Sequence, residues 1–196
     1  MTEVQGRTRA AALPIEERRS AIVAATLPLF LEHGGAVTTR EIAHAAGIAE
    51  GTIFRVFDDK TALLDSVIEA ALDPAPTERA IRAIDANLAF EDRLIAAVGI
   101  LRQRVLYVFH VMSMASGTTR GSTNSRSTEL PALTAIFASE ADGLSRTPAD
   151  AARVLRGLTF ACVHPAFGID EPLSSEDIVA VLLDGIRHPA RRDAPC

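Results

Sequence analysis

The chain has 196 residues, of which 48% are hydrophobic, and a formal net charge of −5. This length suits one globular unit or two small ones that share an interface, and it is long enough for a core without disulfides or metals. The composition excludes an intrinsically disordered chain. The acidic balance excludes a general polyanion binder, so any contact with nucleic acid has to come from a local patch.

The two cysteines, Cys162 and Cys196, are too few for a disulfide framework and indicate a reducing compartment. The N-terminal segment "MTEVQGRTRAA" lacks the apolar stretch of a signal peptide, and the longest apolar runs, such as "AIVAATLPLFL", fall short of a membrane span. We therefore expect a cytoplasmic protein with no membrane partner.

The hydrophobic residues recur with the period of a helix throughout, which predicts an all-α fold. Residues 1–13 are expected to be a flexible N-terminal arm. A first helix is predicted from Pro14 to about His33, ended by a glycine pair. A second begins after Thr38, which forms a capping box with Glu41, and ends at Gly47.

The third predicted helix covers Glu50 to Val56, and the fourth begins near Asp59 and runs to Leu72. Two prolines in the following "DPAPT" segment break the helical pattern. We expect a domain boundary there, with a helix-turn-helix domain over residues 14–72 and a helical domain over residues 73–196.

The second half is predicted to contain longer helices. The pattern indicates a short helix near 79–86, a long one over about 88–115, and three more over about 130–141, 147–164 and 174–187. Thr147 is the expected cap of the second to last, and Ser174 or Ser175 that of the last. The polar, low-complexity stretch 116–128 is predicted to be a loop.

Two short helices joined by a tight glycine-containing turn form a helix-turn-helix, whose second helix lies in the major groove of DNA. The segment "EGTIFRVF" suits that role. Ile53 and Phe57, four residues apart, can anchor its inner face, which leaves Thr52 and Arg55 outside. A guanidinium pairs with guanine edges or phosphates, and Lys60, at the start of the next helix, can meet a phosphate.

The segment from Ala24 to Leu72 resembles the DNA-binding domain of the TetR family of bacterial transcriptional regulators. The resemblance rests on the end of the first helix, the Thr38–Ala43 segment, the Gly47 turn and the "GTIF" run with Phe57 and Lys60. The second half is similar to the family only in the number and length of its helices.

The resemblance implies an N-terminal three-helix helix-turn-helix DNA-binding domain followed by a C-terminal helical ligand-binding and dimerisation domain. The residues expected at the DNA are Thr38, Thr39, Arg40, Gly51, Thr52, Phe54, Arg55 and Lys60. This chain has Ala49 where the family usually has Ser or Thr, which removes a helix cap. It has Glu50 in place of a frequent Lys and Phe54 in place of a frequent Tyr.

Flexible and aromatic residues gather in the second half and suit a pocket for a small apolar or aromatic effector. They are Tyr107, Phe109, His110, Met112, Met114, Phe137 and Phe160. Plain packing in a hydrophobic core is the alternative reading for each of them.

The last two predicted helices have wide apolar stripes with small residues, and the resemblance implies that they pair with their copies in a homodimer. Intramolecular burial is the alternative. We find no Cys/His cluster at metal-ligand spacing, no glycine-rich phosphate loop and no nucleophile motif. The sequence therefore predicts no metal, no cofactor and no catalytic residue.

We expect a DNA-binding transcriptional regulator, a homodimeric repressor that a small ligand releases from a double-stranded DNA operator. The alternatives are an activator of the same architecture without an effector, or a helical interaction module that does not bind DNA.

Overall fold

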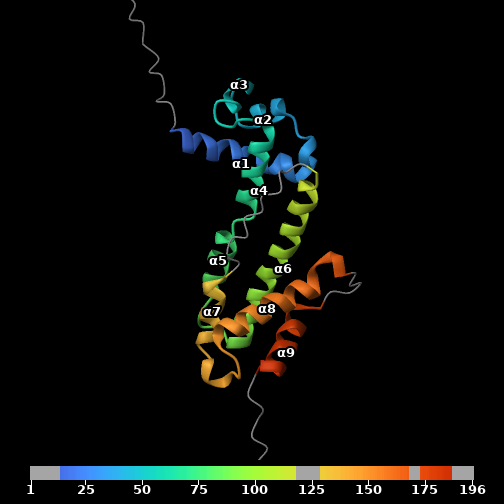
Figure 1. Cartoon of the computed structure of the whole chain (residues 1–196). Helices are drawn as coiled ribbons and strands as arrows, with labels where there is room; N and C mark the ends of the chain where they lie inside the picture. Colours follow the sequence, from blue (N-terminus) through green and yellow to red (C-terminus); the bar gives the residue numbers. More distant parts are fainter. Residues whose placement is uncertain (1–13, 118–128, 168–172, 187–196) are drawn as a thin grey trace, which may run out of the picture. The chain divides into compact units, whose positions relative to one another are not determined.

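The structure is a computed structural model that describes residues 14–117, 129–167 and 173–186 (Figure 1). Its described residues form nine α-helices and three short 3₁₀ turns, with no β-strand among them. The predicted all-α class is confirmed. The expected N-terminal arm and residues 118–128 of the expected loop lie outside the described residues.

The chain divides into two compact units. The first unit runs through Ala71 and also includes the end of the long helix α6 (Phe90–Ala115), from Met114 onward. The second unit begins at Leu72 and contains the rest of α6 and all later described residues except 114–117. Each unit has its own buried core.

The first unit consists of α1 (Ile15–His33), α2 (Thr39–Ala45), α3 (Glu50–Ile53) and α4 (Lys60–Ala71), drawn in blue to green in Figure 1. Helix α1 packs against α4 and α2, and α2 packs against α3. Large side chains from all four helices are fully buried or nearly so in its core: Ile22, Phe30, Ile42, Ile53, Leu63 and Val67.

The ends of these short helices are set by local hydrogen bonds. The predicted capping box is present, because Thr38 accepts from the Glu41 backbone N–H at 3.2 Å while the Thr38 N–H donates to the Glu41 carboxylate at 2.7 Å. Asp59 accepts from the Ala62 N–H at 2.8 Å and so caps α4. Gly34 and Gly47, which follow α1 and α2, adopt positive φ angles of 56° and 64°.

Helix α3 is shorter than predicted, since it ends at Ile53 rather than Val56. Ala49 precedes it without a side-chain cap. The chain continues in a hydrogen-bonded turn, in which the Phe57 N–H donates to the Ile53 carbonyl at 2.9 Å. This turn buries the Phe57 ring in the core, where it is 2% exposed.

The second unit contains α5 (Ala75–Arg82), most of α6, α7 (Pro131–Ala138), α8 (Pro148–Val163) and α9 (Ser175–Ile186). Helix α5 begins earlier than the predicted 79–86, because the prolines do not break it. Pro74 is its N-cap and Pro76 lies in its first turn, where a missing N–H costs nothing. The side chains of Thr77 and Ile81 are buried, and α5 packs against α7.

The caps of the last two helices agree with the sequence. Thr147 accepts from the Asp150 N–H at 3.2 Å, and Ser174 accepts from the Asp177 N–H at 3.0 Å. Helix α7 packs on α8, and α8 packs on α9. The core that they share is built from residues such as Leu94, Val98, Leu133, Phe137, Leu155, Ile178 and Leu183.

By length and hydropathy alone, α6 is long and apolar enough to cross a membrane, although the sequence predicts no membrane span. Core helices of soluble proteins pass the same test. In this chain 28% of that apolar window is buried, and Leu94, Ala97, Val98 and Leu101 of α6 lie in the core of the second unit.

Candidate nucleic-acid interface

The two short helices α2 and α3 are joined by a tight turn at Gly47. The Ile48 N–H donates to the Ala43 carbonyl at 3.0 Å, and the Gly47 N–H donates to the His44 carbonyl at 3.1 Å. These bonds close the end of α2 and redirect the chain into α3. The arrangement is the helix-turn-helix that the sequence predicts.

Helix α3 and its following turn separate an inner face from an outer one. Ile53 is fully buried, and Arg19 covers the buried Phe57 ring, with its guanidinium carbon 4.5 Å from the ring centroid. On the outer side Phe54 is 50% exposed and Arg55 is exposed. Within the part of the chain that the structure describes, the Arg55 guanidinium has no hydrogen-bond or ion-pair partner, so it is available for a base edge or a phosphate.

Two smaller residues of α3 also lie where the sequence predicts. Gly51 is exposed, and a Cβ added to it would meet no atom within 4 Å, so a nucleic-acid backbone could approach closely there. Thr52 is half-buried beside it. Of the predicted set, Gly51, Phe54 and Arg55 are thus exposed and Thr52 is half-buried.

At the start of α2, two hydroxyl groups that the sequence predicts at the DNA are already hydrogen-bonded within the protein. The Thr38 hydroxyl is engaged by Glu41 in the capping box, and the Thr39 hydroxyl donates to the Glu50 carboxylate of α3. Hydrogen bonds from the Thr38 N–H and hydroxyl lower the pKa of the Glu41 carboxyl. Arg40 is exposed.

Lys60 lies at the first position of α4, and its ammonium donates to the Gly35 carbonyl at 2.8 Å. This bond ties the start of α4 to the segment that follows α1. An ammonium carries three N–H groups, so two remain for a phosphate oxygen. The predicted phosphate contact of Lys60 stays a prediction.

The seven residues predicted to bind an effector differ in their surroundings. Phe137 is fully buried in the core, with its ring at 5.9 Å from the Phe90 ring. Met114 belongs to the first unit, near Gly34. Tyr107 lies beneath the Arg104 guanidinium at 5.9 Å, and His110 is exposed.

Two of these seven residues, Phe109 and Phe160, contact the same histidine ring. The rings of Phe109 and Phe160 lie 4.9 and 4.6 Å from the His164 ring, and Phe167 completes the group. Phe109, Phe160 and Phe167 are 37%, 45% and 58% exposed, as is Met112 at 39%. This ring group therefore lies at the surface of the second unit.

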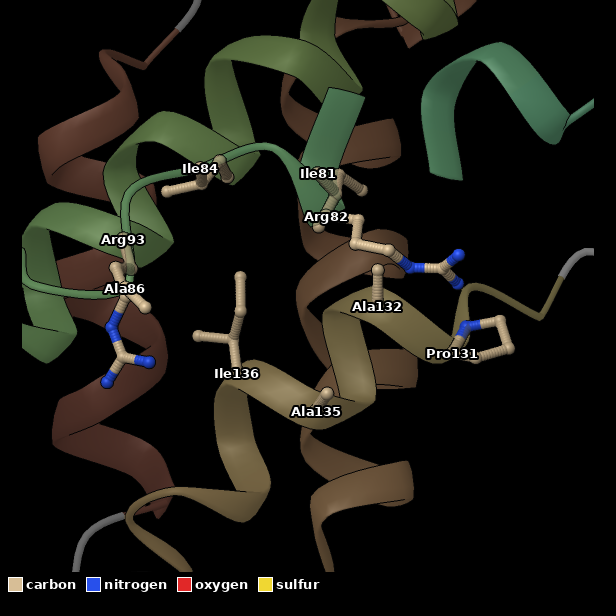
Figure 2. Close-up of a pocket in the computed structure, with 9 residues that line it drawn as sticks. All are labelled: Ile81, Arg82, Ile84, Ala86, Arg93, Pro131, Ala132, Ala135 and Ile136. Atoms are coloured by element: carbon tan, nitrogen blue, oxygen red, sulfur yellow. The ribbon is translucent and has the colours of Figure 1, made fainter. Parts of the chain in front are cut away.

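A pocket of about 430 Å³ lies elsewhere in the second unit, between α5, the start of α6 and α7 (Figure 2). It is open to solvent, and isoleucines form its centre with one arginine on either side (Figure 2). Arg82 is paired with Glu78 at 2.7 Å, whereas the buried Nε of Arg93 has no hydrogen-bond partner among the described residues. The lining residues are Ile81, Arg82, Ile84, Ala86, Arg93, Pro131, Ala132, Ala135 and Ile136.

Sequence reasoning missed this pocket and the contact between Thr39 and Glu50. The pocket combines residues of three elements, and no spacing within one helix indicates it. The contact joins residues eleven positions apart across the turn. A hydroxyl at the start of one helix and a carboxylate at the start of the next were its only sequence signal.

The exposed α3 surface, carried on a turn and a buried core, defines a helix-turn-helix DNA-binding protein. Residues 22–67 match the family described as bacterial regulatory proteins, tetR family. This segment of the chain is that of the TetR family of bacterial regulatory proteins, and this family consists of regulators rather than enzymes.

The whole chain is also similar to known proteins. It is 26% identical over 192 residues to the HTH-type transcriptional repressor KstR2 of Rhodococcus jostii, with 88% of this chain and 92% of that protein covered. A TetR-family transcriptional regulator of Mesorhizobium loti has the same fold, with a TM-score of 0.60, 14% identity, and 90% and 100% of the two chains covered. A TetR-family regulator of Haemophilus influenzae gives a TM-score of 0.55, 14% identity, and 88% and 98% coverage.

Proposed function

We propose that this DNA-binding regulator is a cytoplasmic homodimeric repressor, which a small ligand releases from a double-stranded operator. The observation that carries the DNA-binding part is the exposed surface of α3 and of the turn that follows it, where Phe54 and Arg55 are exposed and Ile53 and Phe57 are buried. The similarity to a protein named as a transcriptional repressor favours repression over activation.

The outer faces of α8 and α9 support a dimer through the last two helices. Val154 on α8 and Val181 on α9 are 48% and 54% exposed. Gly157 and Gly185 are exposed as well, and a Cβ added at either would meet no atom within 4 Å.

Glycine inside a helix costs about 1 kcal/mol relative to alanine. No packing within the described chain requires glycine at these two positions. Close approach of a second chain's helix would use the space that a glycine leaves. One helix-turn-helix domain alone also makes few contacts with DNA, whereas a dimer with two such domains contacts two half-sites.

For the effector we propose a small molecule with apolar or aromatic character that binds the second unit. Two regions support this: the ring group at Phe109, Phe160 and His164, and the isoleucine-centred pocket of Figure 2. The ligand can release DNA only if it binds the released state more tightly than the DNA-bound state.

A gel-shift titration against the promoter region next to the chain's own gene tests the DNA-binding surface. We expect Arg55→Ala to weaken binding by tenfold or more, since base or phosphate contacts are worth about 1–3 kcal/mol. Arg79→Ala removes an exposed arginine from α5 and is the matched control, for which we expect unchanged affinity. Equal affinity of the two variants would contradict a contact between Arg55 and DNA.

The dimer is tested by light scattering coupled to gel filtration. Gly157→Leu should yield monomers with unchanged helicity, because space is open around that position in the chain itself. Ala149→Leu, at another exposed position of α8, should remain dimeric. A dimer that tolerates Gly157→Leu places the interface elsewhere.

Glu50 in place of a basic residue is the observation that favours the rival function, an interaction module without DNA binding. A full-length protein that shows no salt-dependent retention of any promoter fragment would support that rival.

A further inference from the structure

Glu50 is the first residue of α3, and it is exposed. The N-terminal residues of a recognition helix are those that contact base edges in the major groove. A carboxylate at that position is repelled by phosphates and lowers the affinity for DNA in general. A favourable contact between the carboxylate and a base would offset this repulsion at one kind of sequence.

The structure shows how this carboxylate is held. The Thr39 hydroxyl, at the start of α2, donates to Oε1 of Glu50. The second oxygen, Oε2, has no hydrogen-bond partner within the described residues. The two helices thus fix the carboxylate between them and leave one acceptor open.

The chemistry of the major groove decides which base such an acceptor can contact. Guanine presents the acceptors N7 and O6, and thymine presents O4, so both repel a carboxylate. Adenine presents an N6 amino group beside the acceptor N7. Cytosine presents the N4 amino donor with no acceptor on the same base, and a glutamate accepts from it.

We propose that Glu50 is a specificity-determining residue that accepts a hydrogen bond from the N4 amino group of a cytosine in the operator. Thr39 is the positioning residue, because its hydroxyl orients the carboxylate rather than contacting the phosphate backbone. This inference rests on the proposed function, since it requires α3 to enter the groove.

Selection from a randomised duplex library by the full-length protein tests the proposal. The wild-type chain should enrich a C·G pair at one position of each half-site. Glu50→Gln should shift that position toward A·T, because an amide pairs with adenine N6 and N7. We expect the preference for C·G over A·T at that position to change by about tenfold or more, which corresponds to the value of one such base contact.

Variants of Thr39 test whether the C·G preference depends on the orientation of the Glu50 carboxylate or only on its presence. Thr39→Val removes the donor at nearly constant shape and should weaken the C·G preference, whereas Thr39→Ser keeps the donor and should retain it. Circular dichroism should show all four proteins equally folded, because both side chains lie at the surface or half-buried.

Two results would overturn the inference, and they have different meanings. If wild type and Glu50→Gln select the same bases and differ only in overall affinity, Glu50 merely repels the duplex and the DNA-binding function stands. If the wild-type chain enriches no sequence while remaining folded, the proposed function itself fails and the inference fails with it.

Discussion

The two units build their helices in different ways. In the first unit α2 and α3 have 7 and 4 residues, and their ends are set by the Thr38 capping box and by turns. In the second unit α6 and α8 have 26 and 16 residues, and both contribute apolar side chains to the same buried core. Helices as short as α2 and α3 are unstable in isolation, so turns and tertiary packing hold the DNA-facing surface in place.

This difference predicts that the first unit is sensitive to changes in local hydrogen bonds and backbone conformation. The second unit should depend mainly on the volume that its core residues fill. Paired substitutions at chemically similar positions test this difference, because their effects on stability can be compared directly.

The largest effect is expected from Phe30→Ala in the first unit and Phe137→Ala in the second, since both rings are fully buried. Each should lower the free energy of unfolding by about 3–5 kcal/mol. Hydrogen exchange followed by mass spectrometry should then show faster exchange mainly in α1–α4 for Phe30→Ala and mainly in α7–α9 for Phe137→Ala. Equal acceleration in both units by either variant would show that the two cores unfold together.

Next in size is Gly34→Ala, compared with Gly47→Ala. Both residues have positive φ, which costs an L-residue about 1–2 kcal/mol. A Cβ at Gly34 would also lie 3.0 Å from the Met114 carbonyl oxygen, whereas one at Gly47 would meet no atom within 4 Å. We expect Gly34→Ala to lower the melting temperature more than Gly47→Ala, and the reverse order would contradict the close contact with α6.

Removal of a helix cap should have a smaller effect. Thr38→Ala should destabilise the protein by about 1 kcal/mol, and Thr147→Ala, at the equivalent cap of α8, provides the comparison. The bonds from Thr38 lower the pKa of Glu41 in the folded protein, so their stabilisation is present above the unfolded-state pKa of that carboxyl. It is lost as the pH falls through the lowered folded-state pKa.

The difference between wild type and Thr38→Ala should therefore be largest near neutral pH and shrink in acid. Urea denaturation at several pH values measures it. A difference that stays constant down to strongly acidic pH would mean that Glu41 does not contribute to the cap.

The smallest effect is expected at the arginines. Arg82→Ala breaks an exposed pair with Glu78 and should cost less than about 0.5 kcal/mol. Arg19→Ala removes a hydrogen bond to Ser66 at 2.8 Å and uncovers the Phe57 ring, so we expect a loss closer to about 1 kcal/mol. Chemical denaturation of the two variants side by side checks the order.

Features set by near neighbours in the chain could be predicted from the sequence. Thr38, Thr147 and Ser174 cap their helices because each finds its partner three residues away. The inward positions of Ile53 and Phe57 follow from their spacing of four. The start of α5 could not be predicted in this way, because its two prolines permit a helix as readily as they break one, and packing against α7 favours the helix.

Contacts of side chains across a turn or between helices could not be predicted from the sequence. The Thr39–Glu50 contact depends on the angle between α2 and α3, and the Lys60–Gly35 bond depends on how α4 begins beside the end of α1. Aromatic character alone did not separate the buried Phe137 from the exposed Phe160. Their burial depends on which neighbouring helix covers each face.

The first unit is discontinuous in the chain, because it takes Met114 and Ala115 from the end of α6. A recombinant fragment that stops at Leu72 would lack the carbonyl oxygen that lies over Gly34. A protease should cleave this fragment near the end of α1 more readily than it cleaves the intact chain at the same place. We therefore expect an excised DNA-binding fragment of this protein to be more resistant to protease when residues from around position 114 are grafted back onto it.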